Sequence, residues 1–286
     1  MKGIDEFRNK LPDYQGKKIR LFAGIAFVVF VSSLMFQLFL DSLPRIFRRI
    51  DVLQIIAPLT PIIGPLIIIS IGFLLVRKFW RIRVKYLSNY GINAYQKAFK
   101  FVVVGIPMLF SVVVHSFFPT DLIAPYRIDD TLSRYLGISI SGLILGFPFY
   151  NLYIRLVLSI MLVGLGLFVV NRALKFFGID YMALVYIFYP EESTLQNHEI
   201  YSILRHPTYH CLLLISIGSI FFRFSIYSVI YFLILLVGLN IHIKCVEEKE
   251  LIDRFGEEYE KYMETVPAFF VKLKDLKRYF FTLFKN

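Results

Sequence analysis

The chain has 286 residues, 57% of them hydrophobic and 17% aromatic, and several apolar stretches reach the roughly 20 residues that a helix needs to cross a bilayer. Its net charge of +11 comes from basic residues beside apolar segments, which argues against a nucleic-acid partner and for contact with anionic lipid. The two cysteines, Cys211 and Cys245, form no CxxC motif and have no cluster of ligands around them, so no metal site is expected. The sequence therefore predicts an all-α integral membrane protein.

Three crossings are predicted in the amino-terminal half, at residues 21–40, 52–76 and 101–118. The second contains several proline residues and is expected to be one kinked helix. Between it and the third lies the segment 77–100, which has seven Lys or Arg residues and no Asp or Glu. The positive-inside rule places this segment in the cytoplasm.

The second half predicts three more crossings, at residues 152–170, 209–222 and 226–243, of which the last two form a helical hairpin. Residues 137–149 are expected to be interfacial or partly inserted, and residues 178–190 to lie along the membrane surface. With both termini inside, the prediction is about six crossings, with a range of five to eight. The charged tail ends in an amphipathic helix for an anionic membrane surface, with Leu273, Leu276, Phe280 and Leu283 on one face.

Two polar clusters bracket the hairpin: TLQNHEIYSILRHPTYH before it and NIHIKCVEEKELIDRFGEEYEKY after it. Because the hairpin helices are antiparallel, these clusters are expected to meet in space. On the second helix the α-helical spacing puts Asn240, Lys244 and Glu247 on one face, and Lys244 is also spaced to pair with Glu248. Polar groups at the edge of a bilayer are costly unless paired, which indicates a functional site.

The side chains of these clusters suit a zwitterionic, aromatic ligand. A carboxylate binds an ammonium group, histidine and arginine hold a carboxylate or phosphate, and tyrosines stack on a purine. These are the requirements of S-adenosylmethionine and partly those of a nicotinamide dinucleotide. The residues alone do not separate the two.

The motif TLQNHEIYSILRHPTY, followed about forty residues later by EEKELIDRFGEEYEKYMETVP, resembles the isoprenylcysteine carboxyl methyltransferases and the wider group of small membrane methyltransferases that includes phospholipid N-methyltransferases. The resemblance extends over about residues 160 to 268. It implies S-adenosylmethionine-dependent transfer of a methyl group to a lipophilic or prenylated acceptor that enters from the bilayer, at a site facing the cytoplasm.

The resemblance also implies a set of site residues. The cofactor would be bound by Thr194, Leu195, Tyr201, His206, Pro207, Tyr209 and Glu247. The candidate catalytic residues are Arg205, which would also order the loop, Asn240 and Lys244. The isolated histidines His115 and His242 are interpreted as structural.

Four positions depart from the family pattern. Ser193 replaces a histidine, and Glu199 and Cys211 each replace a glycine. The change at Glu199 is harmless if its backbone keeps a negative φ. Ile243 occupies the place of the arginine that holds the substrate carboxylate in the prenylcysteine enzymes, which speaks against a prenylcysteine carboxylate as acceptor.

Two alternatives remain open from the sequence. Membrane sterol and polyprenol reductases are built similarly and use NADPH, but the loop PEESTLQNHE is acidic, which favours the methyltransferase. A transporter or lipid-binding protein with a decayed site is the other. We expect three regions: an amino-terminal membrane region at residues 1–150, a methyltransferase-like core at 151–270 and a basic tail at 271–286.

Overall fold

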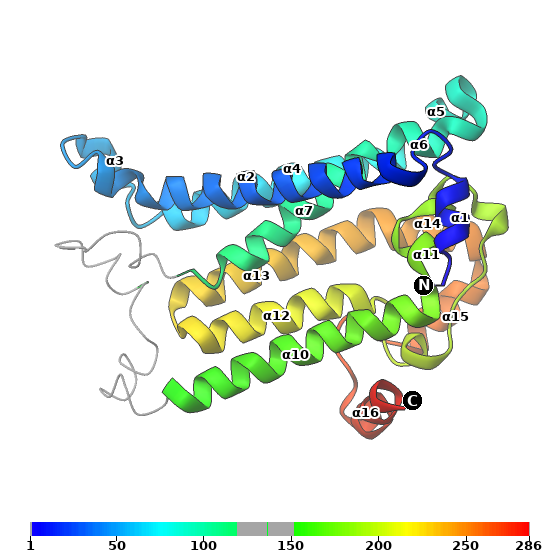
Figure 1. Ribbon diagram of the computed structural model, residues 1–286. Helices are drawn as coiled ribbons and strands as arrows, with labels where there is room; N and C mark the ends of the chain where they lie inside the picture. The colour runs from blue at the N-terminus through cyan, green and yellow to red at the C-terminus, as the bar shows by residue number, and fades with distance from the viewer. Residues whose placement is uncertain (1, 119–135, 137–151, 286) are drawn as a thin grey trace.

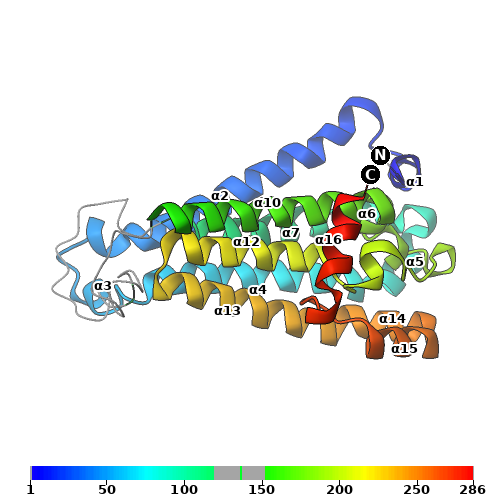
Figure 2. The ribbon, with the colours of Figure 1, turned by 90° about the horizontal axis from the view of Figure 1, so that it is seen from below.

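The computed structural model describes residues 2–118, 136 and 152–285 (Figure 1). Within these ranges every regular element is helical, which confirms the predicted all-α class. The long apolar helices lie side by side as a bundle with their axes along a common direction (Figures 1 and 2). The piece expected at residues 137–149 lies outside the described ranges.

Three long helices form the amino-terminal part of the bundle: α2 (Ile19–Ile46), α4 (Thr60–Arg81) and α7 (Lys100–His115). Helices α4 and α7 approach closely because glycines face each other: a Cβ on Gly105 would lie 3.0 Å from the carbonyl oxygen of Gly72. The shorter elements around them are α1 (Ile4–Asn9), η1 (Gly16–Lys18), α3 (Asp51–Ile55), α5 (Arg83–Tyr90), η2 (Gly91–Asn93) and α6 (Ala94–Ala98).

The expectation of one helix over residues 52–76 is wrong at its start. The chain forms the short helix α3 first, and α4 begins only at Thr60. Pro61 then lies in the first turn of α4, where its missing N–H group costs no hydrogen bond, and Pro65 is the proline inside the helix. The prolines thus start the helix as well as interrupting it.

The carboxy-terminal half is built around the predicted hairpin. Helix α10 (Leu152–Phe177) packs along α12 (Pro207–Arg223), and α12 is followed by the antiparallel helix α13 (Ile226–His242). The turn between α12 and α13 contains Phe224, which has a φ of 52°. Ser225 caps the start of α13 together with Ser228. A π-helical turn, η7 (Ile243–Glu247), joins α13 to α14 (Glu248–Phe255). The connecting elements are α11 (Ile179–Met182), η4 (Val185–Ile187), η5 (Pro190–Glu192), η6 (Glu199–Ser202), α15 (Glu257–Thr265) and η8 (Leu273–Asp275).

Five helical segments in the described part of the chain are long and apolar enough to cross a membrane: Gly16–Ile46, Thr60–Arg81, Arg83–His115, Leu152–Phe177 and Ile226–Phe255. Helix α12 has 17 residues, about 25 Å at 1.5 Å per residue. It lies antiparallel between α10 and α13 (Figure 1) and extends over much of the same depth. The five segments lie within the predicted range of five to eight crossings, and α12 is not one of them.

The tail ends in α16 (Leu276–Phe284), which crosses the bundle transversely near α10 and α12 (Figure 2). The Arg172 Nε atom donates to the Leu283 carbonyl oxygen at 2.6 Å, and the rings of Phe168 and Phe284 stack at 5.1 Å. The predicted apolar face is only partly correct, because Leu283 is fully buried against the bundle whereas Leu273, in η8, is 86% exposed.

Candidate functional site

The two polar clusters meet at one end of the bundle, as expected from the hairpin. The loop before α12 carries Arg205 and His206, whose backbone N–H groups donate to the carbonyl oxygens of Pro267 and Ala268 at 3.0 and 3.2 Å. Pro207 begins α12 at a position that needs no N–H donor. The segment with Pro267 and Ala268 therefore holds this loop in place.

Arg205 forms a buried ion pair with Glu248. Its Nη2 atom lies 2.6 Å from Glu248 Oε1, and the two side chains are 9% and 8% exposed. The same guanidinium donates to the carbonyl oxygens of Met263, at 2.9 Å, and Val266. Arg205 thus joins the start of α12, the start of α14 and the end of α15, which is the geometry of a positioning residue. The predicted pairing of Lys244 with Glu248 is wrong, because Arg205 takes that place.

Three side chains from different elements converge on Glu247. The Tyr209 hydroxyl donates to Glu247 Oε1, the His242 Nε2 atom lies 3.3 Å from the same oxygen, and the His206 Nδ1 atom lies 3.4 Å from Oε2. The rings of His206 and Tyr209 stack with centroids 5.7 Å apart. Glu247 is only 12% exposed, so its carboxylate interacts mainly with these side chains.

The π-turn explains why His242 belongs to this group although it was interpreted as structural. In an α-helix, residues five apart point about 140° away from each other. A π-turn, with its hydrogen bonds from i to i+5, places such residues one above the other, and η7 follows directly after His242. The shared face that α-helical spacing predicts for Asn240, Lys244 and Glu247 therefore does not form.

The N-terminal part of the chain supplies one wall of the site. Two aromatic residues of α4 contact the His242 ring: Phe73 stacks on it at 5.4 Å and Trp80 meets it edge to face at 5.6 Å. Arg83, just after α4, forms an ion pair with Glu250. Glu250 also accepts a hydrogen bond from Arg254 at 3.1 Å. No sequence motif marked these contacts, since they depend on which helix packs beside α13.

Other predicted residues lie at the edge of this group. Tyr201 is buried against Phe177, with ring centroids 4.7 Å apart, and its carbonyl oxygen accepts from the Tyr262 hydroxyl. Burial raises the pKa of Tyr262, so this hydroxyl stays protonated as the donor. The backbone N–H of Thr194 donates to the Tyr181 hydroxyl at 3.2 Å.

The remaining candidates make simpler contacts. Leu195 packs against the cluster of Tyr259 and Val266. Asn240 donates to the Leu236 carbonyl oxygen of its own helix at 3.0 Å, and Lys244 is exposed. The structure therefore brings His206, Tyr209 and Glu247 together, and it directs neither Asn240 nor Lys244 to that carboxylate.

The departures from the family pattern have structural counterparts. Ser193 accepts a hydrogen bond from Arg254 at 3.2 Å, and Cys211 is buried where a glycine was expected. Glu199 has a φ of 51°, so the condition under which its substitution for glycine would be harmless is not met. Ile243 is 1% exposed, so no cation occupies the place of the carboxylate-binding arginine.

Several buried polar atoms around the glutamates are suited to a polar ligand. Tyr259 OH and Trp80 Nε1 have no hydrogen-bond partner in the described structure, and His206 Nε2 lies 3.5 Å from Glu248 Oε1. A cavity of about 350 Å³ adjoins this region, lined by Asn197, Ser202, Glu258, Lys261, Tyr262, Thr265 and Val266. His206 and Glu247 themselves are in direct contact.

Comparison with known proteins identifies this region. Neither a curated protein nor a solved structure matches the chain significantly. A family model does match residues 154–258, which include the RHP loop, the hairpin and both glutamates. Over these residues the chain is similar to the phospholipid methyltransferase family, which implies methyl transfer to a lipid-like substrate.

Proposed function

We propose that the protein transfers a methyl group from S-adenosylmethionine to a lipophilic acceptor at the membrane interface, with its site facing the cytoplasm. The observation that carries the proposal is the convergence of His206, Tyr209 and His242 on the buried carboxylate of Glu247. This group lies inside the region that matches the methyltransferase family. An ionisable cluster at the edge of membrane-crossing helices is costly and therefore indicates a functional site.

The donor set fits the proposed cofactor. Glu247 would bind the ammonium group of its amino-acid part, and the unpartnered Tyr259 hydroxyl offers a hydrogen bond near it. The other residues that would surround it are Thr194, Leu195, Tyr201, Pro207 and Tyr209. When bound, S-adenosylmethionine supplies a methyl group that is already activated by its sulfonium.

The protein's own residues would then act by positioning and by excluding water. Arg205, through Glu248 and the carbonyls of α15, fixes the loop that carries His206. Phe73 and Trp80 shield His242 on the side of α4. Because these side chains already surround Glu247, an incoming ammonium group has to share the carboxylate with them or replace one of them.

The acceptor is proposed to be lipid-like and not a prenylcysteine carboxylate. A carboxylate acceptor would need a cation at the place of Ile243, and that side chain is buried and apolar. The neighbouring Lys244 is exposed on another side of the helix. Labelled-methyl transfer to extracted membrane lipids, compared with prenylated thiols and acids, would identify the acceptor class.

Calorimetric titration of the detergent-solubilised protein would test the cofactor. We expect binding of S-adenosylmethionine and S-adenosylhomocysteine, and loss of both in Glu247→Gln by about a hundredfold, since a charge-assisted contact contributes about 1.5–3 kcal/mol. Glu260→Gln, an exposed carboxylate of α15, is the matched control and should bind normally.

The other outcomes each contradict the proposal in a different way. Binding of NADPH alone would indicate a reductase. No binding of any nucleotide by the folded protein would indicate a lipid-binding or transport protein. Normal binding by Glu247→Gln would place the cofactor elsewhere.

A further inference from the structure

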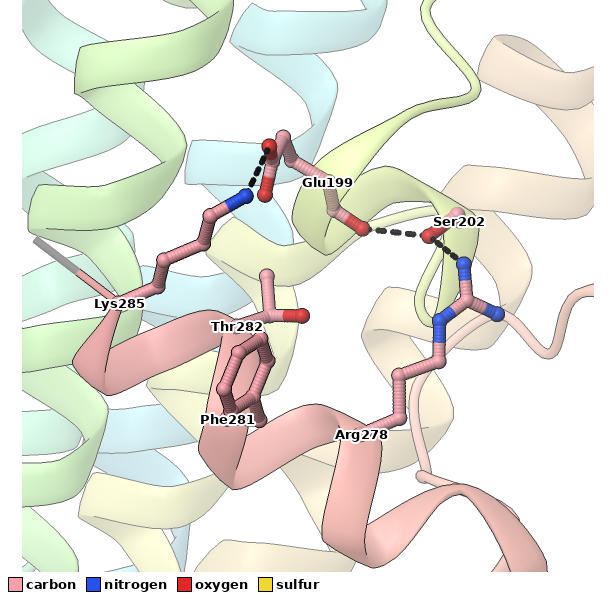
Figure 3. A pocket seen from close by; sticks show the side chains of 6 residues that line it. All are labelled: Glu199, Ser202, Arg278, Phe281, Thr282 and Lys285. Atoms are coloured by element: carbon pink, nitrogen blue, oxygen red, sulfur yellow. Dashed lines mark hydrogen bonds and ion pairs between the residues drawn. The ribbon is translucent and has the colours of Figure 1, made fainter.

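A second cavity lies where the tail helix α16 meets the segment η6, and Figure 3 shows its lining. Its volume is about 260 Å³, and it is lined by Glu199, Ser202, Arg278, Phe281, Thr282 and Lys285. Arg278 Nη2 donates to Ser202 Oγ at 2.6 Å, and Lys285 Nζ lies 3.8 Å from Glu199 Oε1 (Figure 3). The two basic side chains therefore reach from α16 to η6 on either side of the cavity.

The charges of this cavity favour an anion. Two cations face one carboxylate, and the contact between Lys285 and Glu199 is long and partly exposed, so it is worth little. Arg278 uses one of its five N–H donors on Ser202, which leaves the guanidinium fork able to bind a phosphate. An anion placed between Arg278 and Lys285 would gain two charge-assisted contacts.

The position of α16 indicates where such an anion comes from. The helix packs on α10, one of the segments able to cross the membrane, through the Arg172 contact to Leu283 and the stacking of Phe168 on Phe284. Phe281 and Phe284 are 69% and 63% exposed, beside basic residues on the same short helix. Exposed aromatic and basic side chains on a helix transverse to the bundle are typical of the headgroup level of a bilayer.

We propose that this cavity binds the headgroup phosphate of an anionic phospholipid, with Arg278 and Lys285 on the phosphate and the acyl chains beside Phe281 and Phe284 along α10. The occupant is a membrane lipid because the aromatic face continues the lipid-facing surface of α10. The floor of the cavity is η6, which ends at Ser202, three residues before Arg205. In the proposed function, a bound lipid would thereby steady the loop that carries His206.

Lipid selectivity in a reconstituted bilayer tests the binding site. The full-length protein is placed in phosphatidylcholine nanodiscs, and electron spin resonance compares the association of spin-labelled phosphatidylglycerol with that of spin-labelled phosphatidylcholine. The measurement is made at about 1 M salt, where a Debye length of about 3 Å removes general attraction to basic surfaces. No S-adenosylmethionine is present, so the result is independent of whether the protein is a methyltransferase.

We expect the wild type to prefer phosphatidylglycerol, and the double variant Arg278→Ala/Lys285→Ala to lose this preference by about tenfold or more, because two direct charge-assisted hydrogen bonds to the phosphate are removed. Lys274→Ala/Lys277→Ala removes the same charge from η8 and α16 outside the cavity and should keep the preference. Unchanged thermal unfolding would show that both double variants fold.

Three results would overturn the proposal. One is a wild type with no preference at high salt. Another is an equal loss of preference in both double variants, which would mean diffuse attraction to the basic tail. The third is displacement of the labelled lipid by millimolar inorganic phosphate, which would mean that the cavity takes free phosphate and needs no lipid.

Discussion

Two consecutive glutamates at the site share a contact with His206 but differ in their other partners. Glu247 ends the π-turn and meets a tyrosine and two histidines, whereas Glu248 begins α14 and meets the guanidinium of Arg205. The change from π-helical to α-helical geometry falls between them and directs one carboxylate to the proposed ligand and the other to the loop. Their substitution should therefore have different consequences.

Glu248→Ala should destabilise the protein strongly. It leaves the Arg205 guanidinium, 9% exposed, without its carboxylate, and breaking a buried pair from one side costs about 3–5 kcal/mol. Glu247→Gln keeps an acceptor for Tyr209 and should change stability by about 1 kcal/mol. Thermal unfolding in detergent measures both changes, and equal losses of stability would contradict the division of roles.

Glu199 has a strained backbone for a residue with a side chain. A left-handed conformation costs a non-glycine residue about 1–2 kcal/mol, and Glu199 has a φ of 51°. Glu199→Gly should raise the stability, by up to about 1 kcal/mol, since its exposed contact with Lys285 is worth less than the strain. Glu199→Ala loses the same carboxylate and keeps the strain. If both variants unfold at the same temperature, the strain is absent.

The candidate site could be predicted from the sequence only in part, for reasons visible at single residues. His206, Tyr209 and Glu247 stand out because their motif and the hairpin place them at one end of the molecule. His242 was assigned a structural role, because α-helical spacing turns it away from Glu247 and nothing in the sequence announced a π-turn. Trp80 could not be found at all, since its helix meets α13 only in the folded bundle.

At the level of elements, two pairs of polar side chains join α2 to α7, and we call them the polar ladder. Gln37 and Asp41 stand one turn apart on α2 and face Ser111 and His115, one turn apart on α7. Gln37 Nε2 donates to Ser111 Oγ at 3.0 Å, and Asp41 Oδ2 lies 2.8 Å from His115 Nε2. Much of α2 is exposed on its outer side, so this ladder is a main attachment of the helix to the bundle.

Double-mutant cycles would compare the coupling energies of the two side-chain pairs of the polar ladder. Coupling between polar side chains in membranes averages about 0.6 kcal/mol, which we expect for Gln37→Ala with Ser111→Ala. The cycle of Asp41→Ala with His115→Ala should give a larger coupling, because either single change leaves a fully buried ionisable group unpaired. Unfolding in detergent provides the energies. Additive effects in the second cycle would refute the ladder as an attachment.

The spans themselves follow from hydropathy, but their surroundings do not. The pattern of apolar residues predicted α10 and the hairpin, because any helix of that composition must avoid water. It could not tell whether protein or lipid covers an apolar face. Leu283 and Leu273 were placed on the same face, yet the first is buried under α10 and the second is exposed.

For the whole molecule, the amino-terminal helices and the matched region form one body around the site. Helices α4 and α7 pack against α13 across the predicted boundary at residue 150, and Tyr95 donates to the Ala183 carbonyl oxygen at 2.9 Å. Arg83 reaches Glu250 in the same way. The residues before the family match thus help to build the proposed site.

This arrangement also predicts how the molecule is oriented in the membrane. The basic helix α5 lies at the same end of the bundle as α14 and α15, and the connection from α2 to α3 lies at the opposite end (Figure 1). By the positive-inside rule we predict that the end with α5, and with it Glu247, faces the cytoplasm. In a background of Cys211→Ala and Cys245→Ala, two single-cysteine variants test this: Asn89→Cys in α5 and Arg49→Cys at the other end. A membrane-impermeant maleimide added to right-side-out vesicles should label only Arg49→Cys, and permeabilised vesicles should show both. Labelling of Asn89→Cys in intact vesicles would place the proposed site on the outer side, away from cytoplasmic S-adenosylmethionine.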